Sequence, residues 1–254
     1  MRAGREVAAA SGMLAVSSVK YHLPRIGEPF RGEEYRYTTQ QLVEAWGKPP
    51  LPLEIDFSPT LAGDALADDR AQILRWLREV PEQVRAASPV SVHLAVKVMI
   101  ARFDDAFQLA MMDACADADT LVCFNRLFDE RAGTAYGGWD LSDRNLRVLS
   151  AFSERPTARP PERRLCGTGN ICSGRMVLEY ARRGCESVQL HTFFQLPLEE
   201  YPATEGSRTQ RALHVLIFDP RNGLIAVMLE REAAGKLERR GGGLHFLDLV
   251  TGQR

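Results

Sequence analysis

The sequence has no apolar run that approaches the roughly 20 residues needed for a helix to cross a bilayer. It also has little excess charge of either sign, since 32 basic and 33 acidic residues leave a formal net charge of −1. A near-neutral balance argues against a general nucleic-acid-binding surface. Apolar residues make up 45% of the 254 residues, which is ordinary for a globular protein with a large core. We therefore expect no membrane partner and no nucleic-acid partner.

Cysteine is scarce, and its spacing excludes several kinds of metal site. The five cysteines are odd in number and fall in segments that resemble a buried core, which is typical of thiols in a reducing compartment. Cys166 and Cys172 do not have the spacing of zinc ligands, and no cysteine cluster suits an iron–sulfur centre. The N-terminal segment contains Glu6 and predicts an amphipathic helix instead of a signal peptide. These features predict a cytoplasmic protein without a bound metal.

The most informative stretch is residues 163–194, which predicts a unit of strand, helix and strand. The expected elements are the strand Arg164–Cys166, the turn Gly167–Asn170, a helix that begins at Ser173-Gly174, and the strand Ser187–Leu190. Glycines between a strand and a helix let backbone N–H groups approach an anion, and the helix N-terminus adds partial positive charge. Such a pair of glycines is more often a simple tight turn, so the whole unit carries the prediction.

A second turn, at His191-Thr192, follows the second strand of this unit. Two adjacent strand ends that face one phosphate are typical of the last strands of a (β/α)8 barrel. The unit closely resembles the phosphate-binding end of the dihydroorotate dehydrogenase family of FMN flavoproteins. Family positions I-G-T-G-G-I-x-[ST]-G correspond to Cys166–Gly174, and V-Q-[IVL]-x-T corresponds to Val188–Thr192. Asn170 replaces a family glycine, and His191 fills the position before the threonine.

This resemblance implies that FMN is the cofactor. The residues that it assigns to the FMN phosphate in this unit are Gly167, Gly169, Asn170, His191 and Thr192. The loop Tyr136-Gly137-Gly138-Trp139 occupies the place of a family glycine loop beside the same phosphate, so Gly137 and Gly138 are assigned to the cofactor as well.

Leu53–Thr60 resembles the family segment E-[LI]-N-[LIV]-S-[CS]-P-N but is one residue short. By this resemblance Asp56 stands where the family has an asparagine for the substrate, and Ser58 is the candidate catalytic base. An aspartate here would place a charge next to an anionic substrate, which is unfavourable unless it is neutralised. The alternative is that residues 58–60 only form a turn at the end of a strand.

Lys97 lies within the apolar strand predicted for Ser91–Met99. A lysine in a buried strand must direct its ammonium group at an anion or a polar ligand, unless it extends outward to solvent at the strand end. The family has a lysine here that contacts the flavin ring. In contrast, counting back from Arg25 places Ser18 where the family has another lysine that contacts flavin and substrate.

Asn125 and Arg126 follow the strand predicted for Thr120–Phe124. In the family an asparagine at this point binds the pyrimidine ring of the substrate, and an arginine at a strand end would suit a carboxylate. The resemblance therefore makes Asn125 a candidate substrate ligand, and the chemistry of its side chain makes Arg126 another. An asparagine after a strand is also commonly a turn former, which is the alternative.

The predicted fold class is α/β, of the (β/α)8 TIM-barrel type, with about six of the eight strands of a complete barrel. We expect residues 1–254 to form a single FMN-binding barrel domain, abridged at its N-terminal side, with residues 209–254 as a helical extension and tail. Residues 209–234 suit two helices or a hairpin at Asp219–Gly223, and the resemblance favours helices. A further short helix is expected over Tyr37–Gly47, with Thr38 or Thr39 as its N-cap.

The activity that the resemblance implies is oxidation of dihydroorotate, or a related dihydropyrimidine, in pyrimidine biosynthesis. The oligomeric state that we consider for this protein is a homodimer. Two alternatives remain open from the residues. One is a barrel that binds FMN or another phosphate ligand without turnover, as a partner subunit or degenerate paralogue. The other is a fragment produced by an incorrectly assigned start codon.

Overall fold

The computed structural model describes residues 2–21, 23–57, 70–100, 104–125, 127–129, 134–136, 141–155, 163–202 and 205–250. The chain divides into two compact units, each described here by itself. The first contains Met1–Val122, Phe128–Thr134 and Pro160–Arg163. The second contains Cys123–Leu127, Ala135–Arg159 and Arg164–Arg254.

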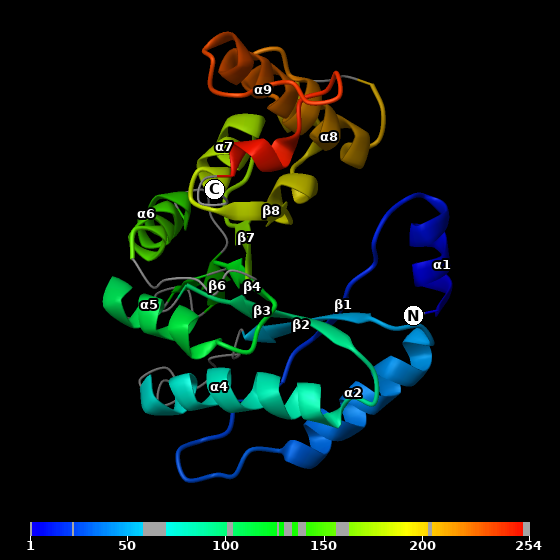
Figure 1. Ribbon diagram of the computed structural model, residues 1–254, viewed down its shortest axis with the longest axis vertical. Helices are drawn as coiled ribbons and strands as arrows, with labels where there is room; N and C mark the ends of the chain where they lie inside the picture. The colour runs from blue at the N-terminus through cyan, green and yellow to red at the C-terminus, as the bar shows by residue number, and fades with distance from the viewer. Residues whose placement is uncertain are drawn as a thin grey trace. The chain divides into compact units, whose positions relative to one another are not determined.

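Strands alternate with helices along both units (Figure 1). The order in the first unit is α1 (Arg2–Ala10), β1 (Ser17–Val19), α2 (Gly32–Trp46), β2 (Leu51–Phe57), α4 (Arg70–Ala87), β3 (Val92–Val98), α5 (Asp105–Ala114) and β4 (Thr120–Cys123). After the short strands β5 (Leu127–Asp129) and β6 (Thr134–Tyr136) come α6 (Leu141–Ser153), β7 (Arg164–Thr168), α7 (Gly174–Ala181), β8 (Cys185–Gln189), η1 (Thr192–Gln195), η2 (Leu198–Glu200), α8 (Arg208–Phe218), α9 (Leu224–Ala233) and η3 (Phe246–Leu249). The predicted α/β class, with about six strands in alternation with helices, is confirmed.

In the first unit the strands lie in the order β1-β2-β3-β4, and β2 pairs in parallel with both β1 and β3. Successive side chains of a strand point to opposite faces of the sheet. Phe57 of β2 packs on Trp76 of α4, with 4.7 Å between the ring centroids, and both side chains are buried. Leu53 and Ile55 lie on the same face of β2 as Phe57, so the opposite face carries Glu54 and Asp56.

Helix α2 begins earlier than the sequence predicts. It starts at Gly32, and neither Thr38 nor Thr39 is its N-cap; Thr39 is fully buried inside the helix. Glutamates at the two positions after Gly32 favour this start, because acidic side chains in a first turn interact well with the helix dipole. The predicted end is confirmed at Gly47, which adopts φ +69° and returns its N–H to the Val43 carbonyl at 3.0 Å.

In the second unit β7 and β8 pair in parallel, and α7 connects them, which confirms the predicted strand–helix–strand unit. The first strand continues to Thr168, so the turn begins two residues later than predicted. Helix α7 starts as expected, because the Ser173 hydroxyl accepts from the Met176 N–H at 3.2 Å. Val177, Tyr180 and Ala181 form its buried face.

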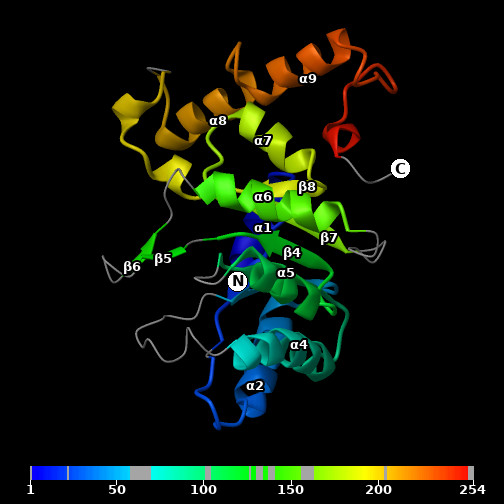
Figure 2. The same cartoon turned by 90° about the vertical axis from the view of Figure 1, so that its left-hand side faces the viewer.

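The C-terminal part of the second unit contains the helices α8 and α9, which confirms helices over a hairpin for residues 209–234. Asp219 ends α8, and its carboxylate accepts from the N–H groups of Arg221 and Asn222 in a local turn. Figure 2 shows α7 beside α8 and α9. An apolar cluster joins α7, α9 and the tail, and it consists of Leu178, Ala181, Val227, Met228, Leu237, Leu249 and Val250. Burial of these side chains fixes the tail against α7.

Candidate functional site

The turn between β7 and α7 has an unusual backbone. Gly169 has φ +105°, and Asn170 has φ +51°, the one positive φ of a non-glycine residue in the described ranges. Asparagine tolerates this left-handed conformation better than most residues. The Asn170 side chain donates to the Ser142 hydroxyl of α6 at 3.0 Å. The turn is therefore held in place by a contact with α6 as well as by its own backbone conformation.

Both glycines of the turn region lie against other groups. A Cβ at Gly169 would come within 2.4 Å of Asn145 Nδ2 and 3.2 Å of the Phe124 carbonyl oxygen. A Cβ at Gly167 would come within 2.3 Å of the Tyr180 ring. Close packing thus requires glycine at each position, in addition to the positive φ at Gly169.

Asn145 of α6 and Tyr180 of α7 are the groups that fill this space, and both are fully buried. Asn145 Nδ2 donates to the Thr168 carbonyl at 2.9 Å and to the Phe124 carbonyl at 3.1 Å. The Tyr180 hydroxyl lies 3.0 Å from the Thr168 carbonyl oxygen and 2.7 Å from that of Gly169. Burial raises the pKa of Tyr180 well above its usual value, so the hydroxyl stays protonated and remains a donor.

The start of α7 packs directly against the start of α9. A Cβ at Gly174 would come within 2.1 Å of the Leu224 backbone nitrogen. The next residue, Arg175, reinforces the contact, since its guanidinium makes two hydrogen bonds of 2.7 and 2.9 Å to the Glu230 carboxylate and another to Asn222. The N-terminal ends of two helices therefore lie next to each other beside the β7–α7 turn, and both contribute partial positive charge there.

The second predicted turn, His191-Thr192, directly follows β8 and its short continuation. Both residues are exposed, and Thr192 starts η1. The register pairs Thr168 with Gln189, so the two strands end at the same edge of the sheet. The turns that start at Gly169 and His191 consequently leave that edge from neighbouring strands, as the sequence predicts.

Asn125 belongs to the second unit, which begins at Cys123, the last residue of β4. It is half-buried and comes directly after the Phe124 carbonyl that Asn145 holds. Four other predicted site residues cannot be assessed in the same way. Ser58, Arg126, Gly137 and Gly138 lie outside the described residues.

The predicted residues of the first unit lie on the polar face of its sheet. Lys97 stands beside Asp56 in the register of β3 and β2, and its ammonium lies 3.9 Å from the Glu54 carboxylate. Ser18 Oγ donates to the same carboxylate at 3.0 Å. Glu54 is only 6% exposed, so this is a largely buried cluster with two acids near one lysine.

Four groups that shape these sites were not predicted from the sequence: Ser142, Asn145, Glu54 and the hydroxyl of Tyr180. Ser142 and Asn145 are three residues apart in α6, on the face that also carries Val148 and Phe152. This spacing indicates that the two polar side chains belong to the buried face of the helix. Nothing in the sequence tells which carbonyls they reach. Glu54 fits the family segment, but it has no role in the resemblance.

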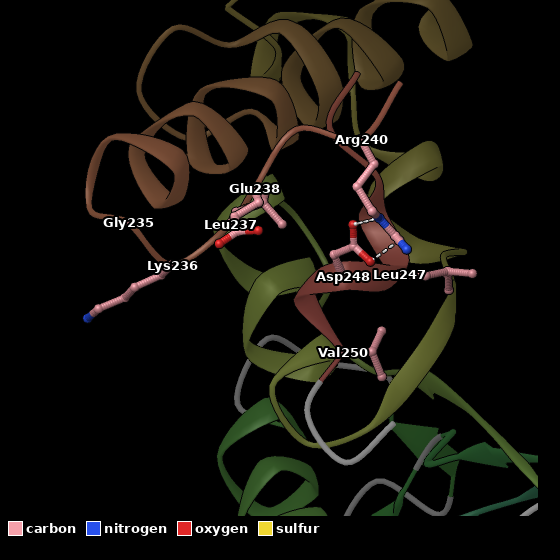
Figure 3. A pocket seen from close by; sticks show the side chains of 8 residues that line it. All are labelled: Gly235, Lys236, Leu237, Glu238, Arg240, Leu247, Asp248 and Val250. Carbon is pink, nitrogen blue, oxygen red and sulfur yellow. Dashed lines mark hydrogen bonds and ion pairs between the residues drawn. The ribbon is translucent and has the colours of Figure 1, made fainter. Parts of the chain in front are cut away.

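A hollow of about 600 Å³ lies in the C-terminal tail, and its lining residues are drawn in Figure 3. Arg240 and Asp248 form an ion pair across it, with 3.0 Å between Arg240 Nε and Asp248 Oδ2. The Lys236 ammonium points away from that pair (Figure 3). Since its charged groups are mixed in sign and partly satisfied by each other, this hollow is a weaker candidate than the β7–α7 turn.

Two further findings concern the described part of the chain. None of its helices is long and apolar enough to span a bilayer. Its histidine, cysteine and acidic side chains form no group of three or more that could hold a metal ion.

The parallel strands, the intervening helices and the turn after β7 define the chain as an α/β protein with a barrel-type strand–helix repeat. No protein-family model and no curated protein sequence matches the chain. It is similar in structure to dihydroorotate dehydrogenase (DHODH) from Eimeria tenella. The structure of that enzyme in complex with ferulenol gives a TM-score of 0.56 at 12% identity, over 82% of this chain and 56% of that one. The ligand-free enzyme gives 0.55 at 12% identity, over 89% of this chain and 60% of that one.

At this identity the comparison shows a fold like that of DHODH, and it leaves activity and cofactor open. The chain spans less than two thirds of the length of these two solved structures. The resemblance found in the sequence and the similarity found in the structure agree on the fold.

Proposed function

We propose that the chain binds FMN through the turn after β7 and acts as an FMN-dependent oxidoreductase on a dihydropyrimidine such as dihydroorotate. The observation that supports this most strongly is the β7–α7–β8 unit, with its left-handed turn at Gly169-Asn170 and the exposed partner turn at His191 after the next strand. It occurs in a fold similar to that of DHODH.

The residues of the unit fit a phosphate group. Backbone N–H groups after Gly169, together with the N-terminus of α7, suit a dianion. Ser173 caps that helix without adding negative charge. In this proposal the phosphate ligands are Gly167, Gly169, Asn170, His191 and Thr192, and Gly137 and Gly138 complete the set.

The remaining roles follow the same proposal. Lys97 would lie at the flavin ring, where a cation favours the reduced form, and Asp56, Asn125 and Arg126 would hold the substrate. Ser58 would take a proton from the substrate, through a water or a neighbouring group. A bound FMN would supply the hydride acceptor, while the protein orients the substrate and excludes water. Residues 1–254 would then form one FMN-binding domain with 209–254 as its extension.

The cluster in the first unit favours a second candidate, a protein that binds FMN but does not turn over. Glu54 lies 3.9 Å from Lys97 and already compensates its charge. Asp56, next to Lys97 in register, adds a second carboxylate where an anionic substrate would have to bind. Both features would weaken the electrostatic support for a reduced flavin and for dihydroorotate.

One titration separates these candidates. Purified protein freed of ligand is titrated with FMN and followed by quenching of flavin fluorescence, and dihydroorotate is then added without oxygen. The proposal expects tight FMN binding followed by bleaching of the flavin absorption band. Binding without bleaching favours the second candidate. A folded protein that does not bind FMN contradicts both candidate functions.

A further inference from the structure

We propose that Asn145 and Tyr180, helped by Ser142, are positioning residues that aim the backbone N–H groups of Gly169 and Asn170 at the phosphate of a bound ligand. The inference rests on the proposed function, since it concerns the same turn. It goes further by assigning a role in ligand binding to three side chains that do not touch the ligand.

The first step is the orientation of two peptide groups. In a trans peptide the C=O of one residue and the N–H of the next point in opposite directions. The carbonyls of Thr168 and Gly169 point toward Asn145 and Tyr180, at 2.7–3.0 Å. The N–H groups of Gly169 and Asn170 therefore point away from these buried side chains, on the opposite side of the turn.

The second step is the strength of this restraint. Asn145 and Tyr180 are both fully buried, so their hydrogen bonds to the turn are made away from competing water. Asn145 Nδ2 also lies 3.5 Å from the Tyr180 hydroxyl oxygen, which links the two donors. Burial raises the pKa of the Tyr180 hydroxyl, so it keeps its proton at neutral pH.

The third step is the reach of Asn145 to a second strand. The same Nδ2 donates to the Phe124 carbonyl, at the end of β4. The Asn145 amide thus connects Phe124, the residue before Asn125, to Thr168, the residue before Gly169. In the proposed function these are the start of a substrate contact and the start of the phosphate turn, so Asn145 would keep the two in fixed relation.

Ser142 completes the set on the side of Asn170. Its hydroxyl accepts from Asn170 Nδ2, and it is buried on the same face of α6 as Asn145. This contact holds the side chain of Asn170, whose backbone is left-handed, against α6. Three hydrogen-bonding side chains from two helices therefore fix a turn of two residues.

The test compares FMN with riboflavin, which is the same flavin without the phosphate. Dissociation constants for both are measured for the wild type, Tyr180→Phe, Asn145→Ala and Ser142→Ala. We expect FMN affinity to fall roughly 10-fold in Tyr180→Phe and somewhat more in Asn145→Ala, since each hydrogen bond lost loosens the turn. Riboflavin affinity should stay unchanged. The matched control on α6 is Ser153→Ala, whose hydroxyl bonds only locally to the Ser150 carbonyl in an exposed position.

The outcomes separate this inference from the proposed function. A wild type that binds FMN no better than riboflavin overturns both. A wild type that prefers FMN, with variants that keep the full preference, overturns the positioning role alone. Equal losses for both flavins also overturn it, because they indicate general destabilisation. If Asn145→Ala fails to fold, Tyr180→Phe decides, since it removes one oxygen atom and leaves the ring packing in place.

Discussion

Gly169→Ala is the most demanding perturbation of the candidate phosphate turn, because two independent costs coincide there. Gly169 has φ +105°, a conformation that residues with a side chain rarely adopt. The added Cβ would also lie 2.4 Å from Asn145 Nδ2 and 3.2 Å from the Phe124 carbonyl oxygen. The substitution therefore has to displace the buried amide that holds the ends of β4 and β7.

The magnitude follows from adding these costs. Backbone strain of this kind costs roughly 1–3 kcal/mol. Forcing a methyl group into a filled site costs about 1–3 kcal/mol more, and displacing Asn145 loses hydrogen bonds worth about 1 kcal/mol each. Since relief of one cost eases another, we expect a loss of about 3–5 kcal/mol in the free energy of unfolding.

Gly235→Ala is the matched control in the same unit. Gly235 has φ +65°, and a Cβ there would meet nothing within 4 Å. Only the left-handed backbone opposes this substitution, so it should cost about 1 kcal/mol. Urea unfolding followed by far-ultraviolet circular dichroism gives both free energies. If Gly169→Ala costs no more than Gly235→Ala, the close approach of Asn145 does not restrain the turn, and the reasoning is wrong.

Three further predictions use the same structure. Lys97→Met should destabilise by about 3 kcal/mol in urea, because it removes the ammonium 3.9 Å from the largely buried Glu54 carboxylate, and Lys97→Met/Glu54→Gln should recover most of this loss. Burial raises the pKa of Glu179, but hydrogen bonds from two arginines outweigh it and leave this pKa lowered. Its contribution to stability should therefore be present above the unfolded-state pKa and be lost as the pH falls through the folded-state pKa, and Glu179→Gln should flatten that acid limb. Cys172 is the one exposed cysteine, so a thiol reagent should modify a single site, more slowly than a free thiol because partial burial raises its pKa, and Cys172→Ser should abolish the reaction.

Local chemistry made part of the fold predictable. The start of α7 could be predicted because the Ser173 hydroxyl accepts a hydrogen bond from the backbone N–H of Met176, three residues later in the sequence. The two C-terminal helices were predicted from the resemblance, since the residues alone also suited a hairpin; in the structure Asp219 closes the turn between the helices with its own neighbours. In each case the residues that decide the structure lie within a few positions of each other.

Contacts between distant residues were not predictable in this way. Thr39 looks like an N-cap in the sequence, but it lies in the middle of α2 and is fully buried, because the helix starts at Gly32. Asn145 reaches carbonyls more than twenty positions away on either side, and no local pattern identifies those partners. Glu54 and Lys97 meet only through the pairing of β2 with β3, so strand register decides that contact.

The glycines of the β7–α7 turn show why a motif alone cannot separate binding from packing. In the sequence they are explained by close approach of a backbone to an anion. In the structure Gly167 is required by the Tyr180 ring, Gly169 by Asn145 and Gly174 by the backbone at Leu224, with no ligand involved. A purely structural turn would need the same glycines. Buried carbonyls need hydrogen-bond donors in either case, so the two explanations differ in whether the N–H groups, which Asn145 and Tyr180 turn the other way by holding the carbonyls, bind an anion. Burying polar side chains behind the turn costs free energy, and it has a clear benefit when the N–H groups of the turn must be held in one direction to bind an anion.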